Sequence, residues 1–323
     1  MNGVHPVKIA VVGVGSVGAS FAYTLLLSGL ATEIVLIDEN RGRAAGEAMD
    51  LHYAVPFSHQ TEIRVGDLHD TAGAAATVIC AGLRQKPGQS EMDLVAHNSG
   101  VIKALVPEIA ERNPGGIILV ATNPVDVMTY GAWKLSELPR RQVIGSGTIT
   151  DSARFRYLLG SHFHVDPNSV HAYILGAHGN SEFPAWSSAN IAGVPIHEMC
   201  YAHGCDPGVL DEIFRQTREA NYGMIDYKGS SCYAIASALV QIVASILRNE
   251  NRIFTVSSVL QREYGVSDVA LSVPTVIGGR GIERILHVGL SDHEVAQFLE
   301  NGREVHSKIM EAEFVVHGEM KAS

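Results

Sequence analysis

Residues 8–38 read KIAVVGVGSVGASFAYTLLLSGLATEIVLID, and this stretch decides the fold. It begins with a short apolar run, which is typical of a buried strand, and the glycine-rich residues 13–18 follow directly. Apolar side chains at helical spacing come next, at residues 21–27, and a second β-branched run at residues 33–37 ends on Asp38. The order strand, glycine turn, helix and strand predicts a βαβ unit at the start of a parallel sheet.

The three glycines of the turn have separate physical roles. Gly13 permits a tight turn, Gly15 lets backbone N–H groups approach a pyrophosphate, and Gly18 lets the helix pack closely on the strand. The N-terminus of the helix then faces the anion. Asp38 lies 20 residues after Gly18, where a carboxylate accepts hydrogen bonds from ribose hydroxyls and repels a 2′-phosphate. The pattern therefore predicts a site for NAD rather than NADP, the alternative being a glycine-rich turn in some other α/β protein.

The composition narrows the classes of partner. The chain has 323 residues, of which 46% are hydrophobic, and this length suggests two domains or one large one. Its formal net charge is −10 and no basic cluster follows a phosphate backbone, so nucleic acid is not an expected partner. The sequence has no window of about 18 uninterrupted apolar residues, and its first residues lack the charged and apolar regions of a signal peptide. We therefore expect neither a membrane span nor a secretory signal.

The four cysteines are Cys80, Cys200, Cys205 and Cys232, too few for a disulfide framework in a chain of this length. Cys200 and Cys205 flank His203, which suggests a metal cluster, but a closed zinc site needs four well-spaced ligands. Reduced thiols in a cytoplasmic protein are the favoured interpretation, and no metal site is expected.

Strands and helices continue to alternate after Asp38. This α/β pattern predicts a doubly wound parallel sheet of the Rossmann type in an NAD-binding domain at residues 1–145. The second half has longer helices and a strand-rich stretch, so we expect an α+β substrate domain at residues 146–323. Helices are expected at residues 44–51, 93–111, 125–135, 151–159, 210–222, 233–248 and 292–310. Strands are expected at residues 61–65, 77–80, 117–121, 143–144 and 169–175, and within 253–276.

Two places in the second half carry candidate chemistry. Asp151 and Arg154 are three residues apart at the start of a helix, so they share a face and can point into one cleft. A guanidinium there can hold a carboxylate in bidentate fashion, although exposed pairs of this kind are common and weakly stabilising. His178 follows the expected 169–175 strand between glycines, a position suited to acid–base chemistry. Most of the 15 histidines must be structural or solvated, so spacing alone leaves both interpretations open.

Taken together, these motifs resemble the L-lactate dehydrogenase family of 2-hydroxy acid oxidoreductases, in its bacterial form. The similarity covers nearly the whole chain. The segments that carry it are GVGSVG (13–18), IVLID (34–38), GEAMDL (46–51), CAGLRQKPG (80–88), ATNPVDV (121–127), GSGTITDSARFR (145–156), HAYILGAHGNSEFPAW (171–186) and SVPTVIGGRGIERIL (272–286).

The resemblance implies a role for each matching residue. His178 would be the general acid that protonates the substrate carbonyl as hydride arrives at carbon. Arg154 would clamp the substrate carboxylate, and Asp151 would hydrogen-bond the imidazole and hold its tautomer. Asn123 would contact substrate near the nicotinamide, and Ser231 matches a threonine that lines the pocket around the substrate side chain.

The resemblance also implies the cofactor and the kind of substrate. Residues at NAD-contacting positions are Gly13, Gly15, Val17, Gly18, Asp38, Arg43, Gly82, Asn123 and Ser146. Gln85 matches the position that separates lactate-type from malate-type enzymes, which carry an arginine there. A neutral amide at Gln85 disfavours a second substrate carboxylate, and with it a malate dehydrogenase.

Glu91 departs from the family pattern. In the family an arginine at this position of the mobile loop closes over the site and polarises the substrate carbonyl, so the charge is reversed here. Loss of such a donor costs several kcal/mol, or about 10²–10³ in rate. An acid in the first turn of a helix also suits the helix dipole, which explains why Glu91 is tolerated but not why the arginine is missing.

Smaller departures surround the predicted histidine. Asn180 stands where the family usually has aspartate, and Ala177 where glutamate is common. An asparagine raises the pKa of an imidazole less than a carboxylate does. Ser231, which is smaller than threonine, widens the expected pocket.

These departures leave three interpretations open. One is an ordinary NAD-dependent L-lactate dehydrogenase, and the second is the same enzyme with a changed substrate, such as a cationic or imine-type 2-oxo acid derivative that pairs with Glu91. The third is a weakly active or non-catalytic NAD-binding homologue. Retention of His178, Arg154 and Asp151 argues against the third, because a binding protein needs no proton donor beside a carboxylate clamp.

The resemblance finally implies a regulated assembly. Arg156 and His171 match positions that bind fructose 1,6-bisphosphate between subunits in allosteric bacterial members, the alternative being that both are merely interfacial. A homotetramer in the cytoplasm is expected from the family, since the sequence itself shows nothing symmetric.

Overall fold

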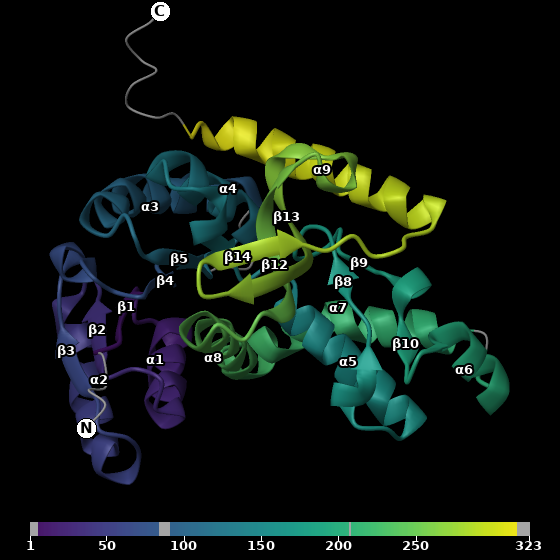
Figure 1. Ribbon diagram of the computed structural model, residues 1–323, viewed down its shortest axis with the longest axis horizontal. Helices are drawn as coiled ribbons and strands as arrows, with labels where there is room; N and C mark the ends of the chain where they lie inside the picture. Colours follow the sequence, from purple (N-terminus) through teal and green to yellow (C-terminus); the bar gives the residue numbers. More distant parts are fainter. Residues whose placement is uncertain (1–5, 84–90, 207, 315–323) are drawn as a thin grey trace, which may run out of the picture.

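The computed structural model describes residues 6–83, 91–206 and 208–314 (Figure 1). Its helices are α1 (Ser16–Ser28), α2 (Arg41–Ala54), α3 (Glu91–Arg112), α4 (Val125–Ser136), α5 (Ile149–Phe163), α6 (Ile196–His203), α7 (Val209–Lys228), α8 (Tyr233–Arg248) and α9 (Asp292–Ala312). Its strands are β1 (Lys8–Val12), β2 (Glu33–Ile37), β3 (Glu62–Val65), β4 (Ala76–Ile79), β5 (Ile117–Val120), β6 (Val143–Gly145), β7 (Val170–His171), β8 (Ile174–Leu175), β9 (Phe183–Pro184), β10 (Asn190–Ile191), β11 (Val194–Pro195), β12 (Arg252–Gln261), β13 (Ser267–Gly278) and β14 (Gly281–Ile285).

The parallel part of the main sheet has the strand order β3-β2-β1-β4-β5-β6. This is the doubly wound order, in which the chain changes direction across the sheet between β1 and β4. The change opens a crevice beyond the carboxyl ends of these two strands, where such folds bind ligands. The predicted fold class is confirmed.

The strands inside this sheet bury both faces, because their side chains alternate between two cores, whereas the edge strand β3 buries only Ile63. In β1, Ile9 and Val11 belong to a core with residues of α1 and α8, whereas Ala10 and Val12 belong to a core with residues of α3, α4 and α9. The ribbon shows these two helical layers on opposite sides of the sheet (Figure 1). Burial on both faces explains why the strands are nearly continuous apolar runs.

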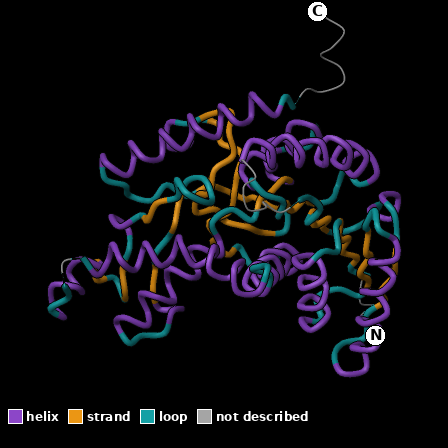
Figure 2. Tube along the Cα trace, turned by 180° about the vertical axis from the view of Figure 1, so that it is seen from behind, coloured by secondary structure: helices purple, strands orange, loops and turns teal. Residues whose placement is uncertain are grey.

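The main sheet continues past residue 145 into the second half of the chain. β12 pairs antiparallel with β6 at Ser257 and Gly145, and β13 and β14 extend the sheet beyond β12. A third core lies around α5, β7 and α6, at the right of Figure 1. The trace seen from behind shows the same separation of the small strands from the main sheet (Figure 2). The division into domains at residues 145 and 146 stays a prediction.

One predicted element is wrong. Residues 169–175 form two short strands rather than one, since β7 pairs with β10 and β8 pairs with β9. The cause is at Ile174, whose N–H donates to Ser152 Oγ at 2.9 Å and whose carbonyl accepts from Thr148 Oγ1 at 2.5 Å. Side chains at the start of α5 thus take the backbone groups that a continuous strand would pair.

No single helix among the described residues is both long and apolar enough to cross a membrane. α7 and α8 meet that requirement only when they are counted together, and they are bent by 120° where they meet.

The glycine turn yields a prediction about stability. A Cβ at Gly18 would lie 2.0 Å from the carbonyl oxygen of Gly13, and neither backbone can yield cheaply. We expect Gly18→Ala to lower the free energy of unfolding by about 1–3 kcal/mol. Gly15→Ala is the matched control, because its Cβ would meet nothing within 4 Å and its φ is −71°. It should change stability by less than about 0.5 kcal/mol in denaturant unfolding. Equal losses for the two variants would contradict this account.

Candidate active site

The glycine turn lies at the carboxyl end of β1 and packs against the neighbouring strand. Gly13 has φ +88°, and a Cβ there would lie 2.4 Å from Ala81 N, just after β4. Gly15 faces open space, and α1 begins there without a side-chain cap or an acidic residue in its first turn. Uncapped N–H groups beside open space fit a pyrophosphate.

Asp38 is fixed beside this turn. Its Oδ2 accepts from Val14 N at 2.8 Å, and its Oδ1 accepts from Asn40 N at 2.9 Å. A carboxylate has about four acceptor positions, so two remain for ribose hydroxyls. Asn40 in turn caps α2 by accepting from Arg43 N at 3.0 Å, which places Arg43 next to the same edge. The residues present therefore fit NAD.

Other predicted cofactor positions lie along the same edge of the sheet. Gly82 follows β4, Ser146 follows β6, and Val17 lies in the first turn of α1. Gly82 has φ +151°, and a Cβ there would meet Thr122 Cγ2 at 2.7 Å. These positions, together with Asn123 after β5, all lie beyond the carboxyl ends of the parallel strands.

Asn98 connects two sides of this crevice, and the sequence reasoning missed it. Its side chain is fully buried and accepts from Leu83 N at 2.8 Å while donating to Leu83 O at 3.1 Å and to Asn123 O at 2.7 Å. It thereby holds the chain leaving β4 against the exposed Asn123. The sequence offered one signal, a polar residue among apolar residues at helical spacing.

The predicted acid–base residues come together from two elements. Asp151, in the first turn of α5, places Oδ2 2.7 Å from Nδ1 of His178, which follows β8. Arg154 Nη1 donates to Asp151 Oδ1 at 3.1 Å and to the carbonyl of Thr217 at 2.7 Å. The side chain of Asp151 is 3% exposed, whereas those of Arg154 and His178 are 15% and 19% exposed. A buried carboxylate thus orients two partly accessible cationic groups.

Glu182 is a second carboxyl group at this histidine, and it was not among the predicted residues. Its Oε2 lies 3.7 Å from His178 Nδ1 and accepts from Gly179 N at 3.2 Å. The signal was present, because Glu182 is four residues after the histidine. It provides a carboxyl group near the ring in a loop where Asn180 replaces the usual aspartate.

The charges of this cluster are strongly coupled. Burial opposes protonation of His178, but Asp151 and then Glu182 outweigh it and raise the pKa of the histidine well above 6.5. Burial alone would raise the pKa of Asp151, whereas His178 and Arg154 lower it. Burial and the like charge of Asp151 raise the pKa of Glu182. The arrangement favours a protonated imidazole beside the buried carboxylate of Asp151.

Asp126 fixes the backbone of the histidine loop from the other half of the molecule. It lies in the first turn of α4, is 3% exposed, and its Oδ2 accepts from His178 N at 2.8 Å. In α9, Asn301 Oδ1 accepts a hydrogen bond from Ala177 N at 2.8 Å. The position of His178 therefore depends on three separate helices.

Several predicted residues are not brought to this cluster by a described contact. Gln85 lies outside the described residues, and Glu91 is described only as the first residue of α3. Ser231 lies between α7 and α8, with its Oγ 3.8 Å from Met224 Sδ. Arg156 donates twice to the carbonyl of Pro167, at 3.2 and 3.1 Å, and His171 is exposed on β7.

Metal binding is not needed to explain the active-site cluster. Ligand atoms of Asp151, His178 and Glu182 lie within 4.8 Å of one another. However, the 2.7 Å contact is a hydrogen bond, and Arg154 balances the buried charge of Asp151.

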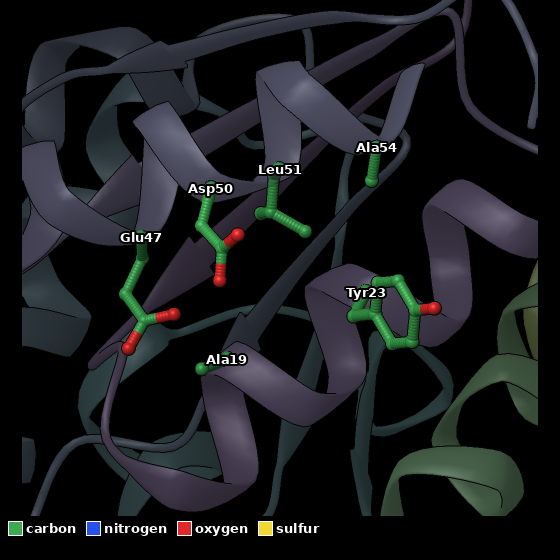
Figure 3. A pocket seen from close by; sticks show the side chains of 6 residues that line it. All are labelled: Ala19, Tyr23, Glu47, Asp50, Leu51 and Ala54. Carbon is green, nitrogen blue, oxygen red and sulfur yellow. The ribbon is translucent and has the colours of Figure 1, made fainter. Parts of the chain in front are cut away.

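A hollow between α1 and α2 contains two more carboxylates, Glu47 and Asp50, with Tyr23 at one side (Figure 3). None of its lining residues belongs to the predicted chemistry.

The fold and the site define a class: the protein is an NAD-dependent oxidoreductase built on a Rossmann sheet. More narrowly, the chain belongs to the lactate/malate dehydrogenase family. Residues 7–145 match the model of the family's NAD binding domain, and residues 148–315 match that of its alpha/beta C-terminal domain.

Named relatives and solved structures agree with this assignment. The chain is 50% identical over 297 residues to an L-lactate dehydrogenase of Acetivibrio thermocellus, covering 91% of this chain and 94% of the relative. It is 47% identical over 306 residues to an L-lactate dehydrogenase of Thermoanaerobacter sp., covering 94% of this chain and 98% of the relative. A lactate dehydrogenase from a Medee basin deep-sea metagenome library superposes with a TM-score of 0.92 at 38% identity, covering 96% of this chain and 99% of that one. A minor L-lactate dehydrogenase from Enterococcus mundtii superposes with a TM-score of 0.91 at 36% identity, covering 94% of this chain and 98% of that one.

The cluster predicts how His178 titrates. Asp151→Asn removes the largest stabilisation of the imidazolium, so the pKa of His178 should fall, and Glu182→Gln should lower it less because that contact is 1.0 Å longer, at 3.7 against 2.7 Å. Histidine NMR titration measures both shifts. Asp166→Asn is the control, since Asp166 caps a different turn.

The same pKa shifts set the sign of a pH effect on stability. The raised pKa of His178 stabilises the fold fully at a pH below the pKa of histidine in the unfolded chain. This stabilisation is lost as the pH rises through the pKa of His178 in the folded protein. The lowered pKa of Asp151 stabilises the fold above the pKa of aspartate in the unfolded chain, and that stabilisation is lost as the pH falls through the folded-state pKa. The pair therefore contributes most between roughly pH 4 and pH 6.5. A His178 pKa that is unchanged in Asp151→Asn would rule out this account.

Proposed function

We propose that the protein is an L-2-hydroxy acid dehydrogenase of the L-lactate dehydrogenase type, which interconverts a 2-oxo acid and the corresponding L-2-hydroxy acid. The observation that carries this proposal is the hydrogen bond of 2.7 Å between His178 and Asp151, with Arg154 on the same carboxylate. This arrangement offers a proton and a carboxylate-binding cation next to each other, and a 2-oxo acid needs both.

His178 acts as the proton donor to the substrate carbonyl. Its Nδ1 is occupied by Asp151, so Nε2 is the atom that carries a proton to the substrate. Asp151 fixes the ring orientation and stabilises the imidazolium before the proton leaves. In the oxidative direction the imidazole starts neutral, and its Nε2 takes the proton from the substrate hydroxyl.

Arg154 binds the substrate carboxylate. Nη1 is used by Asp151 and Thr217, which anchors one end of the guanidinium. A guanidinium has five N–H donors in a fixed plane, so others remain for a bidentate contact with a carboxylate. NADH, when bound, supplies the hydride. Gly15, Asp38 and Asn123 would hold the cofactor along the crevice beside this cluster.

The roles predict separate kinetic defects. His178→Gln should lower kcat for 2-oxo acid reduction by about 10²–10⁴-fold, because it removes the proton donor. Arg154→Gln should raise KM by about 10²-fold, which corresponds to roughly 3 kcal/mol for a charged hydrogen-bonded pair. NADH oxidation measures both effects, and NADH fluorescence titration should show nearly unchanged cofactor affinity in each variant. A His178→Gln enzyme with normal kcat, or failure of the native protein to reduce any 2-oxo acid, would refute the proposal.

A second candidate function keeps this machinery and changes the substrate. The supporting observation is Glu91, which reverses the charge expected on the loop, together with the neutral Gln85 and the small Ser231. A 2-oxo acid with a cationic side chain, or an imine formed from one, would pair with Glu91 where pyruvate has only a methyl group.

The charge of Glu91 decides between the two candidates. If the cationic substrate is correct, kcat/KM for a cationic 2-oxo acid exceeds that for pyruvate, and Glu91→Arg reverses the preference. Glu91→Gln is the matched control, because it removes the anion without adding a cation, and it should lose the cationic substrate without gaining pyruvate. Ordinary pyruvate turnover that Glu91→Arg leaves unchanged or reduces would exclude the changed substrate and leave lactate dehydrogenase.

We also propose a homotetramer in the cytoplasm that responds to fructose 1,6-bisphosphate through Arg156 and His171. Exposed apolar side chains on α1, α2 and the turn that follows support association, since exposed apolar surface is common at interfaces. They are Tyr23, Leu27, Met49, Tyr53 and Phe57. Sedimentation and the same assays with and without fructose 1,6-bisphosphate test the proposal. A monomer, or an activity indifferent to the bisphosphate, would count against it.

A further inference from the structure

A cluster of metal-ligating atoms lies away from the active site, at the opposite end of α5. His162 Nε2, Cys200 Sγ and Cys205 Sγ are all within 4.8 Å of one another. His162 is in the last turn of α5 and Asp151 in the first, so about 16 Å of helix separates them. The proposed dehydrogenase chemistry uses none of the three residues.

The backbone explains why the two thiols meet. α6 ends at Gly204, which has φ +62° and donates its N–H to the carbonyl of Tyr201 at 3.3 Å. Cys205 N donates to the carbonyl of Cys200 at 3.0 Å. This pair of bonds is a Schellman motif, in which the side chains at the positions of Cys200 and Cys205 usually form an apolar contact. Here two sulfur atoms occupy that contact.

The fold brings His162, rather than His203, to the thiols. His162 Nε2 lies 3.3 Å from Cys205 Sγ. His203 lies between the cysteines in sequence, but its Nδ1 is 3.0 Å from the carbonyl of Met199 and its ring packs edge-on against Phe163. Sequence spacing therefore indicates a different third ligand from the one the geometry provides.

We propose that His162, Cys200 and Cys205 form a binding site for a thiophilic cation of the Zn²⁺ class, with a water molecule as fourth ligand. Thiolate and imidazole are the ligands such ions prefer. Bond lengths of about 2.0–2.3 Å place the ligand atoms of a tetrahedral Zn²⁺ about 3.5–3.8 Å apart, so small side-chain rotations seat the ion. The ion would join the end of α5 to the connection between α6 and α7.

Zinc competition tests this in the full-length protein. The reduced protein is titrated with Zn²⁺ against a chromophoric chelator, in a reductant that does not bind metal, and bound zinc is counted by mass spectrometry. We expect one high-affinity Zn²⁺ per chain. Cys200→Ser and Cys205→Ser should each weaken binding by about 100-fold or more, and His162→Asn by at least about tenfold, because lost ligands cost no less than lost outer-shell partners.

His203→Asn is the matched control, and it should change the affinity by less than about twofold. Zn²⁺ should also raise the melting temperature of the native protein but not that of the Cys200→Ser/Cys205→Ser double variant. NADH-dependent activity is measured in parallel to show that the variants fold.

Three results would overturn the proposal. One is zinc binding no tighter than that of the double cysteine variant, and another is equal weakening by His203→Asn and His162→Asn. The third is a Cys200–Cys205 disulfide that forms in air equally fast with and without Zn²⁺, because it would identify a redox pair rather than a metal site.

Discussion

The contact between Asp151 and His178 is the constraint on which the site depends. A carboxylate that is 3% exposed is stable as an anion only with compensation, and here a histidine at 2.7 Å and an arginine at 3.1 Å provide it. Removing one partner of such a buried pair typically costs about 3–5 kcal/mol, because the remaining charge is left unpaired. The interaction that raises the pKa of the imidazole therefore also holds the start of α5 against the loop after β8.

The main sheet brings this pair to the nucleotide crevice. Because the order β3-β2-β1-β4-β5-β6 reverses between β1 and β4, the ends of several parallel strands meet at one edge. Asp126 lies in the first turn of α4, the helix that follows β5, and accepts a hydrogen bond from His178 N. One hydrogen bond thus ties the strand end that carries Asn123 to the loop that carries the proposed proton donor. Hydride and proton transfer require such a fixed relation between cofactor and acid.

Local patterns predicted what depends on neighbours in sequence. The strand–glycine–helix–strand unit and the Asp151–Arg154 contact follow from short spacings, and both are found in the structure. The continuous 169–175 strand was wrong because side chains of α5 compete for Ile174, which no local pattern reveals. Glu182 was missed despite its i+4 spacing, since only the fold shows that its carboxyl group turns back to the ring.

The cysteine cluster shows the same limit from another side. Spacing placed His203 with Cys200 and Cys205, but the end of α6 sends the His203 ring towards Phe163. The histidine that does reach the thiols comes from α5, 38 residues before Cys200 in the sequence. Packing between helices decides such a set of ligands, and it is not encoded in the spacing of the loop itself.

The departures from the family pattern separate chemistry from selectivity. The buried cluster retains a carboxylate, a histidine and an arginine, and Glu182, whose pKa is raised, adds a second carboxyl group 3.7 Å from the ring in the loop where Asn180 adds no charge. The proposed proton donor therefore has its charged partners inside the molecule. Glu91 is the first residue of α3 and makes no described contact with this cluster. The proposed change of substrate therefore rests on a residue outside the buried cluster, and a substitution at Glu91 tests it without altering the proposed proton donor or carboxylate clamp.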